Sequence, residues 1–234
     1  MQLFYQPDLD QNSQQCTFDK EESRHIVKVL RKKEGDTLQV TNGNGLFFTA
    51  EITVANIKNC LATIIKITKS SKPSYNLHLA VAPTKMNDRF EWFLEKATEI
   101  GISEITPIIC EHSERKVVKE ERYEKVLQAA MKQSLQAYLP KLNKTIVFSE
   151  FIKQKINGQK FIAHCEETDK KSLKSQLKTG EDCTVLIGPE GDFSVREIET
   201  ALHHNFIPVT LGKTRLRTET AAIVACHSVA FLNE

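Results

Sequence analysis

The pattern of hydrophobic and polar residues changes about one third of the way along this chain of 234 residues. In the first part, short alternating runs are typical of β-strands, which we expect at residues 37–40, 46–54 and 60–68. The sequence Asn42-Gly43-Asn44-Gly45 between the first two runs is a strong hairpin signal. With one short helix expected near residues 21–30, this part is predicted to be a small, β-rich, barrel-like module.

A different rhythm follows residues 70–74, a polar segment with a proline that is typical of a linker. Strands are expected at 77–82, 105–110, 161–165, 184–187 and 209–211, and helices at 88–100, 120–139, 194–205 and 218–232. Gly101 is expected to end the first of these helices, and Ser194 and Glu197 match a capping box. Strands that alternate with helices predict a mostly parallel sheet covered on both faces. We therefore expect two domains, residues 1–72 and 73–234.

Composition narrows the class of protein only a little. Hydrophobic residues make up 40% of the chain and charged residues 26%, as in ordinary globular proteins. No apolar run reaches the roughly 20 residues that span a bilayer, and no secretory signal is visible. The six cysteines are scattered without a CxxC pair, which argues against disulfides and zinc and for buried, reduced thiols. We expect a cytoplasmic protein without a metal or a membrane contact.

Charge is unevenly distributed, because residues 1–72 carry the whole net charge of +2. Cations cluster in one short segment, and such a cluster favours binding of nucleic-acid phosphates. The candidate RNA-binding residues are Arg24, His25, Lys28, Arg31 and Lys32. The same segment can also be the solvated side of an amphipathic helix, with Ile26, Val27, Val29 and Leu30 against a core. Both interpretations can hold together.

The most informative residues form two turns, at 187–194 and 211–221, each between a predicted strand and a predicted helix. Ligands of open α/β sheets bind outside the carboxyl ends of the strands, so we expect the two turns to be walls of one pocket. Their spacing matches neither a phosphate loop nor a dinucleotide-binding fingerprint. In the second turn, Glu219 can equally be an ordinary helix-start acid and Thr218 an ordinary N-cap. The residues alone thus predict a polar, charged pocket.

The two turns also resemble those of a known family. The run GPEG-x-Phe-Ser-x-x-Glu at residues 188–197, followed by Leu-Gly-x-x-x-Leu-Arg-x-Glu-Thr-Ala at 211–221, is similar to the RsmE family. This family comprises 16S ribosomal RNA uracil-N3 methyltransferases of the SPOUT superfamily. The likeness extends upstream to His25-x-x-x-Val29-Leu30-Arg31, to residues 85–107 and to residues 133–140, so it covers nearly the whole chain in order.

The resemblance implies a fold, a cofactor and partners. It implies an N-terminal PUA-like β-barrel and an α/β domain with a deep C-terminal trefoil knot that holds S-adenosylmethionine. It also implies a homodimer that acts on 16S ribosomal RNA within the small ribosomal subunit. The cofactor-binding residues it implies are Cys165, Ile187, Gly188, Pro189, Glu190, Gly191, Leu211, Gly212, Leu216 and Thr218. Arg215 is an expected RNA contact.

Methylation of uracil at N3 requires loss of a weakly acidic proton, which leaves negative charge on N3 and two carbonyl oxygens. Arg217 is the expected stabiliser of that charge, and Glu219 the expected base or orienting group. The chain departs from the family pattern at Gln136, Asp192 and Thr214. Two alternatives remain open: a SPOUT ribose 2′-O-methyltransferase that acts on transfer or ribosomal RNA, and a non-catalytic RNA-binding factor in ribosome assembly.

Overall fold

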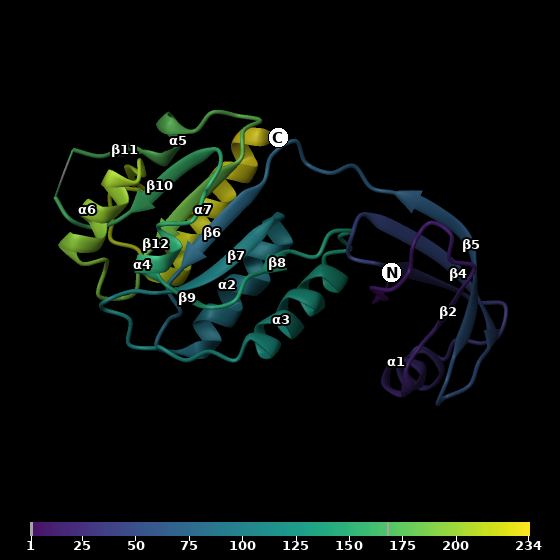
Figure 1. The fold of residues 1–234 in the computed structure, drawn as a ribbon. Coiled ribbons are helices and arrows are strands. Elements are labelled where there is room, and N and C mark those ends of the chain that lie inside the picture. The colour runs from purple at the N-terminus through teal and green to yellow at the C-terminus, as the bar shows by residue number, and fades with distance from the viewer. Residues whose placement is uncertain (1, 168) are drawn as a thin grey trace. The chain divides into compact units, whose positions relative to one another are not determined.

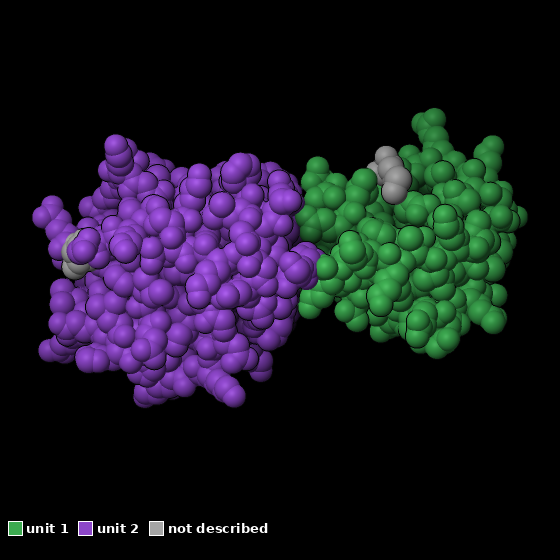
Figure 2. Space-filling view, turned by 90° about the horizontal axis from the view of Figure 1, so that it is seen from above, with its two compact units in different colours: residues 1–72, 131–139 green, residues 73–130, 140–234 purple. Residues whose placement is uncertain are grey.

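Figure 1 shows the fold of the protein as a computed structural model, which describes residues 2–167 and 169–234. The chain forms two compact units (Figure 2). The first comprises Met1–Lys72 and Met131–Leu139, and the second comprises Pro73–Ala130 and Pro140–Glu234. A segment from the middle of the sequence therefore groups with the N-terminal unit. No helix of the described residues is long and apolar enough to cross a membrane.

The first unit is built on a five-stranded sheet with the order β1-β3-β4-β5-β2. Its strands are β1 (Leu3–Tyr5), β2 (Gln15–Thr17), β3 (Thr37–Thr41), β4 (Leu46–Val54) and β5 (Leu61–Lys69). β1 pairs with β3 in parallel, and the other pairs are antiparallel. The predicted hairpin between β3 and β4 is confirmed. β1 and β2, of three residues each, were not predicted.

One face of this sheet encloses an apolar core, because alternate residues of β3 and β4 point inward. The expected helix near residues 21–30 is α1 (Lys20–Arg24) followed by a π-helical turn, η1 (His25–Val29). Asp19 caps α1, and its Oδ1 accepts a hydrogen bond from the Glu22 amide at 2.8 Å. Ile26 is buried in the core, but Val29 is 64% exposed. The prediction that Val29 faces the core is therefore wrong. Val29 is the last residue of the π-helical turn η1.

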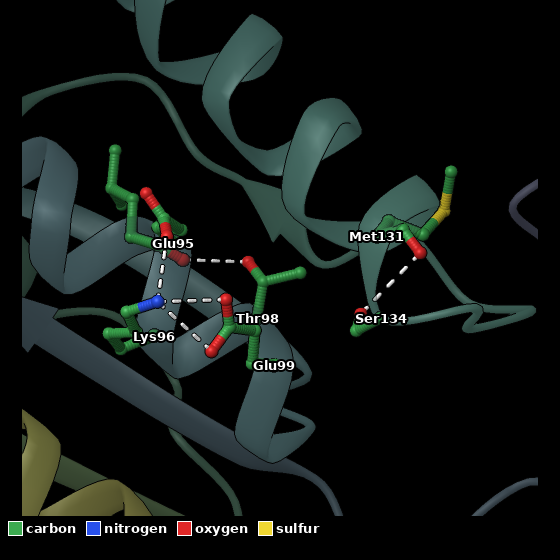
Figure 3. A network of polar contacts seen from close by, with 7 residues as sticks. Glu95, Lys96, Thr98, Glu99, Met131 and Ser134 are labelled. Carbon is green, nitrogen blue, oxygen red and sulfur yellow. Dashed lines mark hydrogen bonds and ion pairs between the residues drawn. The ribbon is translucent and has the colours of Figure 1, made fainter. Parts of the chain in front are cut away.

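The helix predicted over 120–139 ends earlier, since α3 spans Glu120–Gln133. Leu135 adopts a left-handed φ of 57°, and its amide donates to the Lys132 carbonyl. The Gln136 amide reaches back to the Met131 carbonyl at 3.1 Å, which completes a Schellman ending. Figure 3 shows this last turn, where Ser134 also donates to the Met131 carbonyl.

After that turn the chain pairs with the loop of the β3–β4 hairpin. The Leu139 amide donates to the Gly43 carbonyl at 2.8 Å, and the Gly45 amide donates to the Ala137 carbonyl at 2.9 Å. Gly45 has a φ of +89°, and a Cβ there would lie 2.4 Å from the Tyr138 hydroxyl. Glycine is thus required both for the turn and for the close approach of this segment.

The second unit contains an eight-stranded sheet in which every pair is parallel. The order is β11-β13-β10-β12-β6-β7-β8, and β9 also pairs with β7. The strands are β6 (Leu77–Val81), β7 (Glu104–Ile109), β8 (Lys141–Leu142), β9 (Ile146–Val147), β10 (Gln159–Ala163), β11 (Lys171–Ser172), β12 (Cys183–Ile187) and β13 (Ile207–Thr210). The parallel sheet is confirmed, whereas the trefoil knot stays a prediction.

Helices pack on both faces of this sheet. They are α2 (Asn87–Ile100), α4 (Phe148–Phe151), α5 (Leu173–Gln176), α6 (Val195–His203) and α7 (Thr218–Asn233). α7 packs against α2, β6 and β12, while residues of α4 and α6 share a core with Ala80, Ile162 and Leu186 of the strands. The capping box of α6 is confirmed, with both the Ser194 and the Glu197 side chains bonded to the backbone.

α2 ends where the sequence predicted. Gly101 has a φ of 104°, and its amide donates to the Ala97 and Thr98 carbonyls. On the surface of this helix, Lys96 Nζ lies 2.7 Å from Glu95 and 3.0 Å from Glu99 (Figure 3). These side chains are partly exposed, so the ion pairs add little to stability. The buried face of the helix, with Phe90 and Phe93, holds it in place.

Candidate functional site

Three loops meet at the carboxyl edge of the parallel sheet, because β13, β10 and β12 are neighbours in it. A pocket of about 370 Å³ lies between the loops that follow β10 and β13. A second pocket, of about 310 Å³, lies between the loop after β10, the Gly188 turn and the start of α7. The two pockets share the lining residues Ala163, Cys165, Arg215, Leu216 and Ala221. The two turns singled out in the sequence therefore border one continuous hollow.

The turn after β12 is tight and is tied to its neighbours. The Asp192 amide donates to the Pro189 carbonyl at 2.9 Å. A Cβ on Gly188 would lie 3.0 Å from the Phe193 ring, so a larger residue there would displace buried apolar packing. Glu190 Oε1 accepts a hydrogen bond from the Lys85 amide at 2.9 Å, which joins the turn to the loop after β6.

Asp192, one of the positions at which the chain departs from the family pattern, adopts a left-handed φ of 63°. Aspartate tolerates this conformation better than most residues with a side chain. Its Oδ2 accepts a hydrogen bond from the Cys165 amide at 2.7 Å, and its Oδ1 accepts one from the Phe193 amide at 2.9 Å. The departure at this position therefore preserves the turn and adds a link between the loops after β10 and β12.

Replacing Asp192 with alanine should lower the free energy of unfolding by about 2 kcal/mol. Alanine loses the two charge-assisted hydrogen bonds and places a Cβ in a left-handed conformation that the carboxylate no longer favours. Asp192→Asn, which keeps an acceptor and tolerates this φ, should cost less than about 1 kcal/mol. Urea denaturation of the two variants measures the difference. No loss in either variant would show that neither the carboxylate bonds nor the backbone conformation matters.

The second turn is joined to the first by a buried hydrogen bond. The Thr218 hydroxyl donates to the Gly188 carbonyl at 3.0 Å. Thr218 is the first residue of α7, and Arg217 occupies the N-cap position without a side-chain cap. The interpretation of Thr218 as an ordinary N-cap is therefore wrong, since its hydroxyl holds the two turns together. Arg217 is exposed and lines the smaller pocket.

Glu219 is a buried carboxylate in the first turn of α7, only 8% exposed. Its Oε1 lies 3.9 Å from Nε of Arg89, on α2. Its Oε2 is buried and has no hydrogen-bond partner among residues 2–167 and 169–234. A buried oxygen without a partner is costly. The macrodipole of α7 offsets part of this cost.

Most of the predicted cofactor-binding residues lie together. The smaller pocket is lined by Cys165, Ile187, Gly188, Pro189, Glu190, Leu216 and Thr218, and the larger by Cys165, Leu211, Gly212 and Leu216. Of the predicted cofactor-binding and catalytic residues, Gly191 and Glu219 line neither pocket. Gly191 instead packs against His112, where a Cβ would lie 3.1 Å from the His112 Cβ. Arg215, predicted to contact RNA, lines both pockets.

Sequence reasoning missed several lining residues. The larger pocket also contains Ala163, His164, Lys170, Val209, Thr210, Lys213, Thr214 and Ala221. For Ala163, His164, Val209 and Thr210 the available signal was position, since the carboxyl ends of parallel strands lie at the ligand-binding edge. His164 precedes Cys165 there, and it is the buried titratable side chain of this group.

The candidate RNA-binding residues belong to the first unit. Arg24, Lys28 and Arg31 are exposed, whereas His25 and Lys32 are partly buried. Arg31 has a left-handed φ of 55° and lines a shallow cavity of about 520 Å³ together with Lys32 and Lys33. These cations lie in one segment that runs from the end of α1 through η1 to the residues after it, and such a segment suits contacts with a phosphate backbone.

A larger cavity, of about 660 Å³, lies at the opposite, amino edge of the sheet in the second unit. It is lined by polar residues such as His78, Glu104 and Asn143, and by none of the site residues predicted from the sequence. Size alone therefore does not mark the site, because ligands of parallel sheets bind at the carboxyl edge. Within the described residues, no group of His, Cys, Asp and Glu could hold a metal ion.

Comparison with known families defines the class of protein. Residues 70–230 match the family described as RNA methyltransferase domain, and residues 18–65 match the RNA methyltransferase PUA domain. The class is therefore that of RNA methyltransferases with a parallel-sheet domain and an N-terminal PUA domain.

Relatives narrow this class further. The chain is 33% identical to ribosomal RNA small subunit methyltransferase E of Buchnera aphidicola, covering 95% of this chain and 90% of that one. A probable rRNA-methyltransferase from Porphyromonas gingivalis has a similar structure, with a TM-score of 0.93 and 40% identity over 100% of this chain and 98% of that one. Ribosomal RNA small subunit methyltransferase E from Neisseria gonorrhoeae, bound to S-adenosyl methionine, has a TM-score of 0.88 and 27% identity, covering 100% and 98% of the two chains. The chain belongs to the ribosomal RNA small subunit methyltransferase E family.

Proposed function

We propose that this protein transfers a methyl group from S-adenosylmethionine to N3 of a specific uridine in 16S ribosomal RNA of the small ribosomal subunit. The observation that carries the proposal is the hollow at the carboxyl edge of β13, β10 and β12, bordered by both turns that resemble the family. Family membership and the S-adenosyl methionine bound to a relative support the same conclusion.

The residues of the hollow fit a nucleoside cofactor. The turn after β12 supplies one wall of the smaller pocket, through Ile187, Gly188, Pro189 and Glu190. The ring nitrogens of His164, at the wall of the larger pocket, are buried and have no partner among the described residues. Cys165, Gly188, Leu211 and Leu216 would hold the cofactor, which supplies the methyl group on a positively charged sulfur. No metal is needed for this chemistry.

Two side chains would then act on the uracil ring. Arg217, exposed at the mouth of the smaller pocket, stabilises the negative charge that develops on the uracil carbonyl oxygens when N3 loses its proton. Glu219 accepts that proton or orients the group that does, because one of its buried oxygens lacks a partner in the described chain. The target base is taken out of its stack to reach the methyl donor.

The first unit would bind the RNA. Arg24, Lys28 and Arg31 are exposed, close in sequence and positively charged, so they suit contacts to phosphates on either side of the target. We further propose that the protein acts in the cytoplasm as a homodimer. Trp92 of α2 and Phe231 of α7, which are 45% and 61% exposed, are candidate residues for that interface.

The test is nucleoside mass spectrometry of 16S ribosomal RNA from a strain that lacks the gene. We expect N3-methyluridine to disappear, to return with the wild-type gene, and not to return with the Arg217→Ala variant. Loss of a 2′-O-methylated nucleoside instead would assign the protein to the ribose methyltransferases. An unchanged nucleoside profile, together with no binding of S-adenosylhomocysteine to the purified protein, would identify a non-catalytic RNA-binding factor.

A further inference from the structure

His164 stands out among the residues around the two turns. It directly follows β10, is 8% exposed, and lines the pocket between the loops after β10 and β13. Neither Nδ1 nor Nε2 has a hydrogen-bond partner within residues 2–167 and 169–234. Buried polar side chains in native proteins nearly always have hydrogen-bond partners. Two ring nitrogens without partners at a pocket wall therefore point to a ligand that supplies the missing partners.

The chemistry of the ring limits what that ligand group can be. Burial lowers the pKa of His164, and the nearby Lys170 ammonium lowers it further, against the opposing charges of Asp192 and Glu166. The imidazole is therefore neutral near pH 7, with one N–H donor and one acceptor nitrogen. Such a ring suits a hydroxyl or the edge of a heterocyclic base, which also donate and accept. It adds nothing to the recognition of a formal charge.

The rest of the pocket has an apolar part and a positively charged part. Ala163, Leu211 and Leu216 supply apolar surface for a flat ring, whereas Lys213 and Arg215 are exposed cations that suit a carboxylate. His164 is 8% exposed, unlike the two exposed cations. The lysine beside it, Lys170, donates to the backbone carbonyls of His164 and Glu166 and thereby holds the loop that carries the imidazole.

We propose that His164 binds the nucleoside end of the methyl donor, the adenine edge or a ribose hydroxyl, and so sets the affinity of this site for adenosine-containing ligands. The inference rests on the proposed function, because it presupposes that the hollow holds S-adenosylmethionine. It adds a specificity-determining side chain to a site otherwise assigned mainly to backbone groups and apolar residues.

The test is titration calorimetry of the full chain with two probes, S-adenosylhomocysteine and 5′-methylthioadenosine. The second probe keeps the nucleoside but lacks the amino-acid end. We expect His164→Phe to raise the Kd of both probes by the same factor, roughly tenfold or more, since a ligand polar group then lies buried without a partner. His164→Gln, which restores a donor and an acceptor, should recover part of the loss. The exposed His203 of α6 provides the control, and His203→Phe should leave both Kd values unchanged.

The thermal stability of the ligand-free protein separates a binding role from a structural one. Phenylalanine removes two unsatisfied polar atoms from a buried site, so the Tm of His164→Phe without ligand should equal or exceed that of the wild type. A lower Tm with weaker binding would mean that the imidazole supports the fold, which overturns the inference. Weaker binding of S-adenosylhomocysteine alone would assign His164 to the charged end of the ligand and would also overturn it.

The same titrations distinguish failure of the inference from failure of the proposed function. A wild-type protein that binds neither probe would refute the proposed function. A wild-type protein that binds both, with His164→Phe binding equally well, would refute the role of His164 alone.

Discussion

Replacing Arg217 with alanine should lower kcat by about 100- to 1,000-fold, while the Kd of S-adenosylhomocysteine stays within about threefold of the wild-type value. Arg217 is exposed and lines the smaller pocket beside Thr218. Its guanidinium would face the uracil oxygens, where negative charge exists only as N3 loses its proton. An interaction made in the transition state affects kcat and hardly affects ground-state binding. Single-turnover methylation of small ribosomal subunits measures the rate, and calorimetry measures the affinity.

The controls separate charge from geometry. Arg217→Lys keeps the positive charge but loses the planar pair of donors, so its rate should fall between those of Arg217→Ala and the wild type. Arg196, an exposed arginine of α6, supplies the matched control, since Arg196→Ala removes one surface charge from the same unit and should leave kcat unchanged. If Arg217→Ala turned over at the wild-type rate with normal cofactor affinity, the role assigned to Arg217 would be wrong.

Local signals in the sequence predicted the longer elements well. The capping box at Ser194 and Glu197 and the helix stop at Gly101 both formed as expected, because their hydrogen bonds join residues within a single turn. The shortest strands and helices, such as β8, β9 and α4, have two to four residues each. That length is too short to show a period in the sequence.

The early end of α3 could not be predicted in the same way. Pro140 was the visible helix stop, but the left-handed Leu135 ends the helix first. The residues after it then form hydrogen bonds with the backbone of Gly43 and Gly45, more than 90 residues away in sequence. The Thr41 hydroxyl likewise donates to the Ala137 carbonyl, across a separation of 96 residues. A long-range backbone pairing of this kind overrides a local helix preference.

The candidate site was predictable at the level of loops but only partly at the level of side chains. The positions of both turns followed from the carboxyl ends of parallel strands. The links between the turns, from Asp192 to the Cys165 amide and from Thr218 to the Gly188 carbonyl, join residues 27 and 30 positions apart and leave no local signature. A single histidine such as His164 also carries no motif, and only its burial without partners distinguishes it.

Replacing Glu219 with glutamine should lower kcat by about 100-fold at neutral pH, because a positioned base contributes at least that much to a proton transfer. The deficit should shrink as the pH rises, since solvent then removes the N3 proton and the missing base matters less. Glutamine has the shape of glutamate, so the packing at the start of α7 is retained. The measurement is the rate of methylation against pH, for Glu219→Gln and the wild type in parallel.

An alternative role for Glu219 is structural, as the partner of Arg89 at 3.9 Å. That role predicts that Arg89→Ala and Glu219→Gln lower the free energy of unfolding to a similar extent and leave the shape of the pH profile unchanged. Glu199, an exposed residue of α6, serves as the matched control, and Glu199→Gln should behave as the wild type in both measurements. A constant rate deficit for Glu219→Gln at every pH would contradict the proton-transfer role. A deficit that narrows with pH for Glu219→Gln, but not for Arg89→Ala, would place the proton on the carboxylate, because only the loss of a base can be compensated by hydroxide.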